Sequence, residues 1–319
     1  MNKRIKNWQA ELEYLSKSLK DSQSIDLIKF EVLEKTVMSI SSYLEEHYSN
    51  ISGKELKEKQ AEFRKFTDSI FQQSYFFRRA RQWPRGYPGD YETLEQNYQG
   101  VPIESEGIGM YLDNYFLTRT LAEGVRERKE FLSELILKEL ESRSEGQRIL
   151  NIGCGSSREI FDIGKRINKF GSQITFLDYD EEAVNYSKLL LYNGGIDISE
   201  FGFEKYNAFK LTSVEETKSK FGKKDIIYSA GLFDYIKTDG LLKMIHSLYS
   251  LLDEGGVIIA PFKDRKNYGT FDYHWLGDWA YFYQRTIEDV TGILEKASGT
   301  KVEIIPSGTS AINFFILRK

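Results

Sequence analysis

The sequence contains few of the residues from which disulfide networks and metal centres are built. Its 319 residues include one cysteine and three histidines. A single cysteine excludes a disulfide framework within the chain and a cysteine-based zinc site. The histidines, aspartates and glutamates show no spacing typical of metal ligands, so we expect no metal cofactor.

Long apolar runs and a large excess of one charge are also missing. There is no apolar run of about 18 residues, and the N-terminal residues are not followed by the apolar core of a signal peptide. We therefore expect no membrane span and a cytoplasmic location. The net charge of −4 and the balanced charges of the N-terminal region provide no basic surface for nucleic acid.

What the sequence does contain is organised around one stretch, residues 148–160. An apolar run ends there in a Gly-x-Gly turn, and an amphipathic segment follows. This pattern is typical of a buried parallel strand, a tight turn and a helix whose N-terminus faces a ligand. We expect a cofactor to contact the turn at Gly153, Cys154, Gly155 and Ser156.

Two classes of cofactor use such a turn. Dinucleotide-binding turns have a third glycine where this chain has Arg158, so we expect no binding of nicotinamide dinucleotides. Methyltransferases that use S-adenosylmethionine commonly show an acid-x-Gly-x-Gly-x-Gly pattern. That pattern would place an acid at position 151 and a glycine at 157, where this chain has Asn151 and Ser157.

A second apolar run, residues 173–178, ends in an acid about 25 residues after the glycine turn. A carboxylate at the end of the second strand of such a fold can accept hydrogen bonds from the ribose hydroxyls of an adenosine. We expect Asp178 to do so, with Tyr179 beside it. Asp180 is better placed to cap the helix predicted over 181–191.

The rest of the C-terminal half alternates strands with helices. A Thr212-x-x-Glu215 capping box predicts one of the helices, and the strands are expected within 203–209, 225–235 and 257–261. The alternation predicts a parallel sheet. Residues 301–305 and 311–317 are two further strands joined by a short turn, which must be antiparallel. We expect an α/β, Rossmann-like sheet of the methyltransferase type, mostly parallel and closed by an antiparallel hairpin.

Several of these segments resemble class I S-adenosylmethionine-dependent methyltransferases: Ile149–Ile160, Phe176–Asp178 and Tyr228–Tyr235. Pro84–Glu92 resembles a bacterial small-molecule branch that includes 3-hydroxypalmitic acid methyl ester synthases. The resemblance covers roughly residues 80–319 and implies S-adenosylmethionine as the cofactor. On this basis we expect adenine contacts at Asn207, Ala208 and Phe209, methionine contacts at Ser229, Ala230 and Gly231, and an arginine, Arg126 or Arg128, at the methionine carboxylate.

The N-terminal region has a different character. Residues 4–80 show helical periodicity throughout, so we expect a helical cap or lid over 1–110 and a cofactor-binding domain over 111–319, which begins with one long helix at 111–140. The helices could equally stabilise the sheet domain or form a homodimer. A basic stretch with interleaved aromatics, residues 76–85, is either a binding surface for an anionic acceptor or a solvated helix face.

We expect the acceptor site between Tyr87–Glu92 and Tyr268–Arg285, with the N-terminal helices closing it. The first segment is a turn that serves as a lid or only as a connector. Candidate catalytic residues are Tyr87, Asp90 and His274, and the last of these could also be an ordinary loop residue. The candidate substrate contacts are Phe233, Tyr235, Tyr273, Trp279, Tyr283 and Arg285.

The sequence therefore predicts an enzyme that methylates a small molecule at oxygen, with a carboxylate favoured over a hydroxyl because an ionised carboxylate needs no general base. Two alternatives remain. One is a protein carboxyl methyltransferase whose helical region docks its partner. The other is a non-catalytic sensor that binds S-adenosylmethionine, an idea motivated by Asn151 and Ser157.

Overall fold

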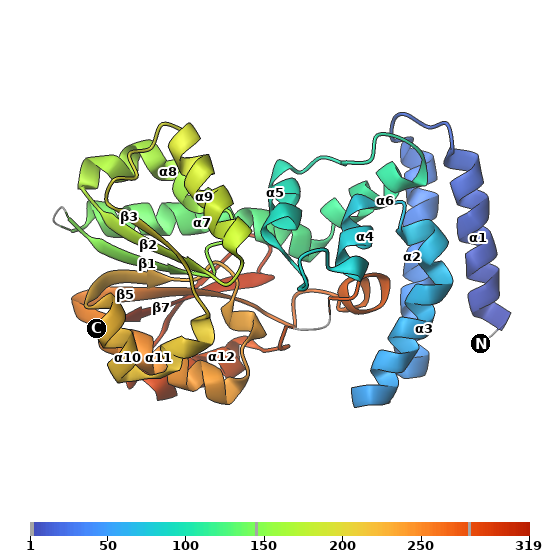
Figure 1. The fold of residues 1–319 in the computed structure, drawn as a ribbon. Coiled ribbons are helices and arrows are strands. Elements are labelled where there is room, and N and C mark those ends of the chain that lie inside the picture. Colours follow the sequence, from blue (N-terminus) through green and yellow to red (C-terminus); the bar gives the residue numbers. More distant parts are fainter. Residues whose placement is uncertain (1–2, 144–145, 280–281) are drawn as a thin grey trace. The chain divides into compact units, whose positions relative to one another are not determined.

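The structure, a computed structural model, describes residues 3–143, 146–279 and 282–319. The chain forms two compact units (Figure 1). The helical unit comprises Met1–Ala122 and Gly269–Tyr281, and the sheet unit comprises Glu123–Tyr268 and Phe282–Lys319. The sequence placed the division at residue 110. The structure adds residues 111–122 to the helical unit. It also adds Gly269–Tyr281, the returning segment, because side chains of that segment pack among the helices of this unit.

Three helices of the helical unit begin with a side-chain cap. Asp26, Ser74 and Asp90 accept hydrogen bonds from backbone N–H groups at the starts of these three, which satisfies donors that a helix leaves unpaired. The helices of the unit are α1 (Lys3–Leu19), α2 (Leu27–Tyr48), α3 (Gly53–Phe71), α4 (Tyr75–Gln82), α5 (Tyr91–Gln99) and α6 (Gly107–Leu117), and the returning segment contributes the π-helical turn η4 (Asp272–Leu276).

Apolar residues at helical spacing form the core of this unit, although Leu27, Ile28 and Val32 at the start of α2 are exposed. Leu12, Leu15 and Leu19 of α1 are buried, as the spacing predicted. Phe76 of α4 stacks on Phe116 of α6, with ring centroids 4.6 Å apart. Aromatic pairs of this kind contribute about 0.5–1.5 kcal/mol beyond the area that they bury.

The prediction of one long helix over 111–140 is wrong, because the chain forms two helices there, α6 and α7 (Thr120–Glu141). The hydroxyl of Thr118 donates to the carbonyl of Tyr115, 3.0 Å away, and the amide of Arg119 donates to the carbonyl of Phe116. A threonine that bonds its own backbone in this way competes with helix propagation.

The sheet unit is built on seven strands in the order β3-β2-β1-β4-β5-β7-β6. The first five strands are parallel, and β7 is antiparallel to both of its neighbours. This confirms the Rossmann-like fold closed by a C-terminal hairpin. The strands are β1 (Arg148–Ile152), β2 (Gln173–Asp178), β3 (Phe201–Lys205), β4 (Lys224–Tyr228), β5 (Leu252–Lys263), β6 (Glu303–Pro306) and β7 (Ile312–Arg318).

Helices cover both faces of this sheet, as the ribbon shows (Figure 1). Ile149 and Leu150 of β1 are fully buried in different clusters, because neighbouring side chains of a strand point to opposite faces. One cluster packs under α7, α8 (Arg158–Ile167) and α9 (Glu181–Asn193). The other packs under α10 (Val214–Phe221), α11 (Thr238–Leu251) and α12 (Ile287–Ser298).

Two of the predicted helix starts can be compared with the structure. Asp180 caps α9 by accepting from the amide of Glu182 at 3.0 Å, which confirms its predicted role. The capping box predicted at Thr212 is wrong. Thr212 ends the short 3-10 helix η2 (Ala208–Thr212), and Ser213 caps α10 instead, since its side chain is the one that reaches the amide of Glu216.

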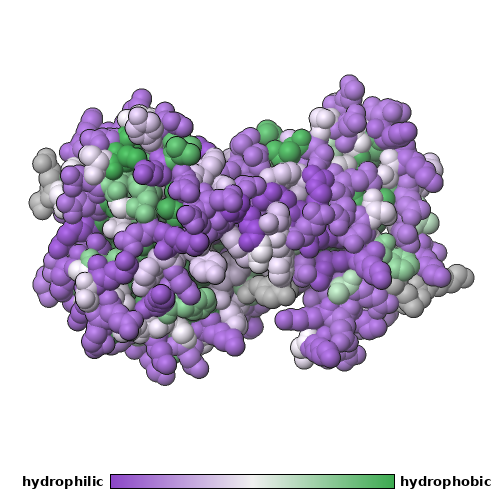
Figure 2. Space-filling model, in the orientation of Figure 1, coloured by the Kyte–Doolittle hydropathy of each residue, from purple (hydrophilic) through white to green (hydrophobic). Residues whose placement is uncertain are grey.

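The visible face of each unit is mainly hydrophilic (Figure 2). Some large apolar side chains are nevertheless exposed, among them Tyr179 and Phe209 in the sheet unit. No helix among the described residues is long and apolar enough to cross a membrane.

Candidate functional site

The glycine turn after β1 is fixed to the end of β2. Gly153 and Gly155 have φ angles of 68° and 52°, a region that favours glycine. The amides of Gly153 and Cys154 both donate to the carbonyl of Leu177, at 2.7 and 2.9 Å. A side chain at position 153 would begin 3.1 Å from Cβ of Leu232, so the turn is also close to the loop that follows β4.

Ser157, where the family pattern would have glycine, also has a left-handed backbone, with φ 53°. A non-glycine residue in that conformation costs about 1–2 kcal/mol. Its hydroxyl is buried and accepts a hydrogen bond from the hydroxyl of Ser187 at 2.7 Å, which offsets part of the cost. The turn thus keeps the glycine-type geometry although the glycine is absent.

Asp178 lies at the end of β2, beside the turn. Its Oδ2 accepts from the amide of Gly155 at 2.9 Å, and its Oδ1 accepts from the amide of Asp180 at 3.0 Å. Burial raises the pKa of this carboxyl group, and the two backbone donors act against that rise. Each carboxylate oxygen can accept more than one hydrogen bond, so Asp178 is held in place and still has capacity to bind a ligand.

Two aromatic side chains follow the neighbouring strands β2 and β3. Tyr179 is 70% exposed and Phe209 is 60% exposed. Asn207 accepts from the amide of Phe209 and so starts η2, the turn that carries this ring. Exposed rings at the carboxyl edge of a parallel sheet suit a flat ligand such as adenine.

Arg128 of α7 lies against the loop that follows β4. The side chain is 4% exposed, and Nη1 lies 2.8 Å from the point where a Cβ on Gly231 would be, so the guanidinium lies against the backbone of this loop. Among the described residues, no hydrogen bond or ion pair to this guanidinium is found. Arg126 is two positions away and so lies on a different face of the helix, where it is half-buried. Of the two arginines considered from the sequence, Arg128 is thus the one at the predicted methionine loop.

A buried carboxylate from another element, that of Glu159, lies beside Asn151, the position where the family pattern has an acid. Glu159, in the first turn of α8, is fully buried and accepts from Nδ2 of Asn151 at 3.1 Å and from the hydroxyl of Tyr228 at 2.9 Å. Burial raises the pKa of Glu159 to about 7. Oδ1 of Asn151 has no hydrogen-bond partner within the described residues. A glutamate eight residues downstream gives no recognisable signal in sequence, because only the helix position brings it back to the strand.

The carboxyl ends of β4 and β5 hold several of the predicted substrate contacts. Phe233 and Asp234 belong to the 3-10 turn η3 (Phe233–Tyr235). Phe233 is fully buried and stacks on Phe262, so its ring serves the core. Arg285 is buried and donates to the carbonyls of Phe233 and Ile236. Tyr235 is partly exposed, and Tyr283 is 38% exposed.

The other predicted acceptor-site residues lie in the helical unit. Gly89 packs on Trp279 so closely that an added Cβ would lie 2.6 Å from the indole, so the two predicted pocket segments do meet there. Residues 280 and 281 of the second segment lie outside the described residues. Tyr87 is half-buried and Tyr273 is buried.

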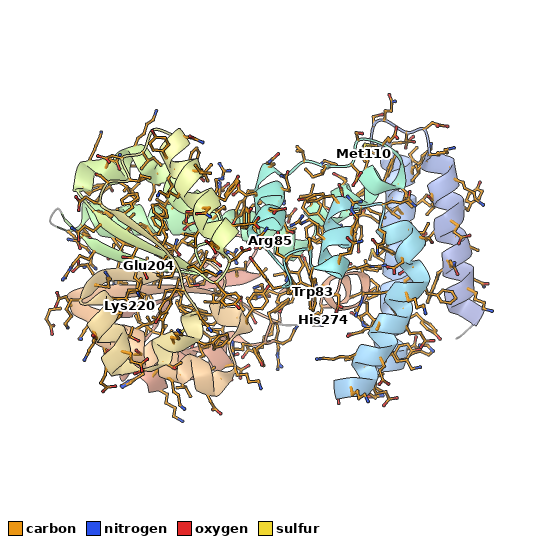
Figure 3. The ribbon with its side chains drawn as sticks, viewed as in Figure 1. Trp83, Arg85, Met110, Glu204, Lys220 and His274 are labelled. Carbon is orange, nitrogen blue, oxygen red and sulfur yellow. The ribbon has the colours of Figure 1, made fainter. Side chains whose placement is uncertain are left out.

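Two of the candidate catalytic residues, His274 and Asp90, make contacts within the helical unit. Burial lowers the pKa of His274 to about 4, with a further contribution from Arg64, which donates to the carbonyl of His274. Figure 3 shows His274 below Trp83 in this view. Asp90 caps α5 and accepts from Arg79 at 2.6 Å, with its side chain 2% exposed. Their catalytic roles stay predictions.

The basic stretch 76–85 is neither a solvated helix face nor a set of unpaired cations. Each of its arginines has a carboxylate partner within the helical unit. The pairs are Arg78 with Glu104, Arg79 with Asp90 and Glu92, Arg81 with Asp68, and Arg85 with Glu92. In the described part of the chain, no group of histidine, cysteine, aspartate and glutamate side chains could hold a metal ion.

Comparison with known proteins agrees with this geometry. A family model described as “Putative methyltransferase” matches residues 86–262. “Uncharacterized protein YnbC” of Escherichia coli (strain K12) is 24% identical over 171 residues, which cover 52% of this chain and 28% of that protein. The chain thus spans well under a third of the length of this curated relative.

Two solved structures share the fold. A possible exported protein from Bordetella parapertussis has a TM-score of 0.59 at 18% identity, covering 72% of this chain and 79% of that one. The CurJ carbon methyltransferase has a TM-score of 0.50 at 14% identity, covering 88% of this chain and 70% of its own. At such low identity the likeness concerns the fold alone.

Proposed function

We propose, from the premise that this chain belongs to the family described as “Putative methyltransferase”, that it transfers a methyl group from S-adenosylmethionine to an oxygen of a small molecule. The observation that carries the proposal is the carboxyl edge of the sheet. There, a fixed glycine turn, an oriented carboxylate and a buried arginine lie around the ends of β1, β2 and β4.

The residues at this edge fit S-adenosylmethionine. Asp178 would accept hydrogen bonds from the ribose hydroxyls, and Tyr179 and Phe209 would flank the adenine. The loop Ser229–Gly231 would support the methionine part, with Arg128 at its carboxylate. Arginine forms two parallel hydrogen bonds with a carboxylate. A buried guanidinium that makes no hydrogen bond or ion pair with the described residues is suited to that task. When bound, the cofactor supplies a methyl group on a sulfonium centre.

The protein's contribution to the chemistry is positioning. Displacement at a methyl carbon requires the acceptor atom to lie in line with the bond that breaks, and holding both reactants in that geometry provides much of the acceleration. A carboxylate acceptor is ionised at neutral pH and needs no base. We therefore favour a carboxylate over a hydroxyl acceptor. We also propose a cytoplasmic location, as expected from the sequence.

Calorimetry with S-adenosylhomocysteine tests the cofactor site. We expect Asp178→Ala to weaken binding about tenfold or more, because at least one charge-assisted hydrogen bond is lost. Asp180→Ala is the matched control, since that side chain caps α9 and should leave the affinity within about twofold. Equal affinities for the two variants would contradict the assignment of Asp178 to the ribose hydroxyls. Micromolar binding of NAD would contradict the choice of cofactor.

Transfer of a labelled methyl group into native cell extract tests the acceptor. We expect the label in a small-molecule fraction. Label in protein would favour the protein carboxyl methyltransferase, and cofactor binding without transfer into any fraction would favour the non-catalytic sensor.

A further inference from the structure

Lys263, the last residue of β5, has a buried ammonium group at the carboxyl edge of the sheet. Its Nζ donates to Oδ2 of Asp234 at 2.5 Å, and the side chains are 9% and 2% exposed. Asp234 lies in η3, which follows β4, and its Oδ1 also accepts from the backbone amide of Lys263 at 3.3 Å. The pair thus joins the ends of two neighbouring parallel strands, where ligands of open α/β sheets bind.

The ammonium has more donors than the described residues satisfy. A lysine ammonium carries three N–H groups, and Asp234 accepts from one of them. Nζ also lies 4.8 Å from the ring centre of Phe282 and 5.5 Å from that of Tyr235. Ring faces attract a cation but do not replace a full hydrogen bond in a buried site. Within the described ranges, no second hydrogen bond from Nζ is found.

Burial and neighbouring charges both act on the pKa of this ammonium. Burial lowers the pKa of Lys263, Arg128 lowers it further, and Asp234 acts in the opposite direction. A buried charge that keeps spare donors gains from an anionic oxygen.

We propose that Lys263 binds the methyl acceptor by donating a hydrogen bond to its carboxylate, while the rings of Tyr235 and Phe282 contact the adjoining apolar part. Asp234 is then a positioning residue that holds the ammonium in place. This inference rests on the proposed function, and it assigns the acceptor to the class of apolar carboxylic acids.

The chemistry is consistent with this assignment. The acceptor oxygen provides the electron pair of the new O–CH3 bond, the pair of the broken S–CH3 bond stays on sulfur, and no proton is released. The product is a neutral ester. The ester has lost the charge that Lys263 attracts, which favours its release. An amine acceptor in its protonated form would be repelled by the same ammonium.

The experiment compares Lys263→Met with Lys263→Arg, and uses Lys266→Met as a matched control. Lys266 lies three residues further along the chain and pairs with Glu288 on the surface. Each variant receives S-adenosylmethionine with a labelled methyl group in native cell extract, and the label that alkali releases as methanol measures ester formation. The melting temperature and the affinity for S-adenosylhomocysteine are measured in parallel.

We expect Lys263→Met to lose about tenfold or more of the alkali-labile label, because a charge-assisted hydrogen bond is lost. Lys263→Arg keeps the charge and should retain most of it, and Lys266→Met should match the wild type. All variants should bind S-adenosylhomocysteine within about twofold of one another.

Wild-type label in alkali-stable products, or undiminished ester formation by Lys263→Met, would overturn the inference while leaving the proposed methyltransferase intact. Equal losses in Lys263→Met and Lys263→Arg, accompanied by weaker S-adenosylhomocysteine binding or a lower melting temperature, would show that the pair is only a structural link. A wild type that transfers no methyl group would instead refute the proposed function itself, and this inference with it.

Discussion

The two units differ in how fully their buried arginine and lysine side chains are paired with acids. In the helical unit, Arg79 and Arg81 each pair with a carboxylate at 2.6 Å. In the sheet unit, the guanidinium of Arg128 has no such partner among the described residues, and the ammonium of Lys263 has one. A buried charge costs free energy unless it is compensated. Cations that the protein compensates itself hold the fold together, and cations that it leaves incompletely compensated are the better candidates for binding ligands.

This difference reverses the impression given by the sequence. The basic stretch at residues 76–85 is a candidate in the sequence for binding an anion, and in the structure its arginines pair with acids of the helical unit. Arg128 and Lys263 are inconspicuous in the sequence.

The largest effect is expected from breaking a compensated pair. Asp90→Ala should lower the free energy of unfolding by about 4 kcal/mol, because it leaves Arg79 without its main buried partner and removes the cap of α5. Urea unfolding measures the loss. Glu92→Gln is the control and should cost about 1 kcal/mol or less, since Glu92 is more exposed. A loss of catalysis by Asp90→Ala without a loss of stability would instead support the catalytic role suggested by the sequence.

A somewhat smaller effect is expected from pH in the helical unit. The pKa of His274 is about 4 in the folded protein, below its ordinary 6.5, so the unfolded chain binds the proton more readily. The contribution of His274 to stability is therefore complete above pH 6.5 and is lost as the pH falls from 6.5 to about 4, to a total of about 3 kcal/mol.

Urea unfolding of wild type and His274→Gln across that range isolates this contribution. We expect the wild type to lose more stability than the variant as the pH falls. Parallel pH profiles would show that His274 is already able to bind a proton in the folded protein.

The smallest free-energy change is expected from replacing Arg128, because the loss of this side chain should affect cofactor binding more than folding. Arg128→Met should weaken S-adenosylhomocysteine binding tenfold or more, equivalent to about 1.4 kcal/mol or more. Arg126→Met should change the affinity by about twofold at most. Calorimetry on both variants decides between the two arginines, and the opposite order would restore Arg126 as the carboxylate ligand.

Local patterns accounted for most of the fold. The glycine turn, the cap at Asp180, the alternation of strands and helices and the terminal hairpin follow from spacings of a few residues, and the structure confirms them. The single helix expected over 111–140 failed because the hydroxyl of Thr118 bonds the chain's own backbone, a competition that apolar periodicity does not reveal.

The sequence by itself determined the class of fold, the turn after β1 and the acid that ends β2, because these depend on backbone conformation and on neighbours along the chain. The tertiary structure alone decided which charges are compensated. Lys263 and Asp234 are 29 residues apart in sequence, and Arg128 meets the loop after β4 only through packing of α7. Coulomb attraction and desolvation depend on distance and burial in space, so residue type and spacing could not show which cations remain available to a ligand.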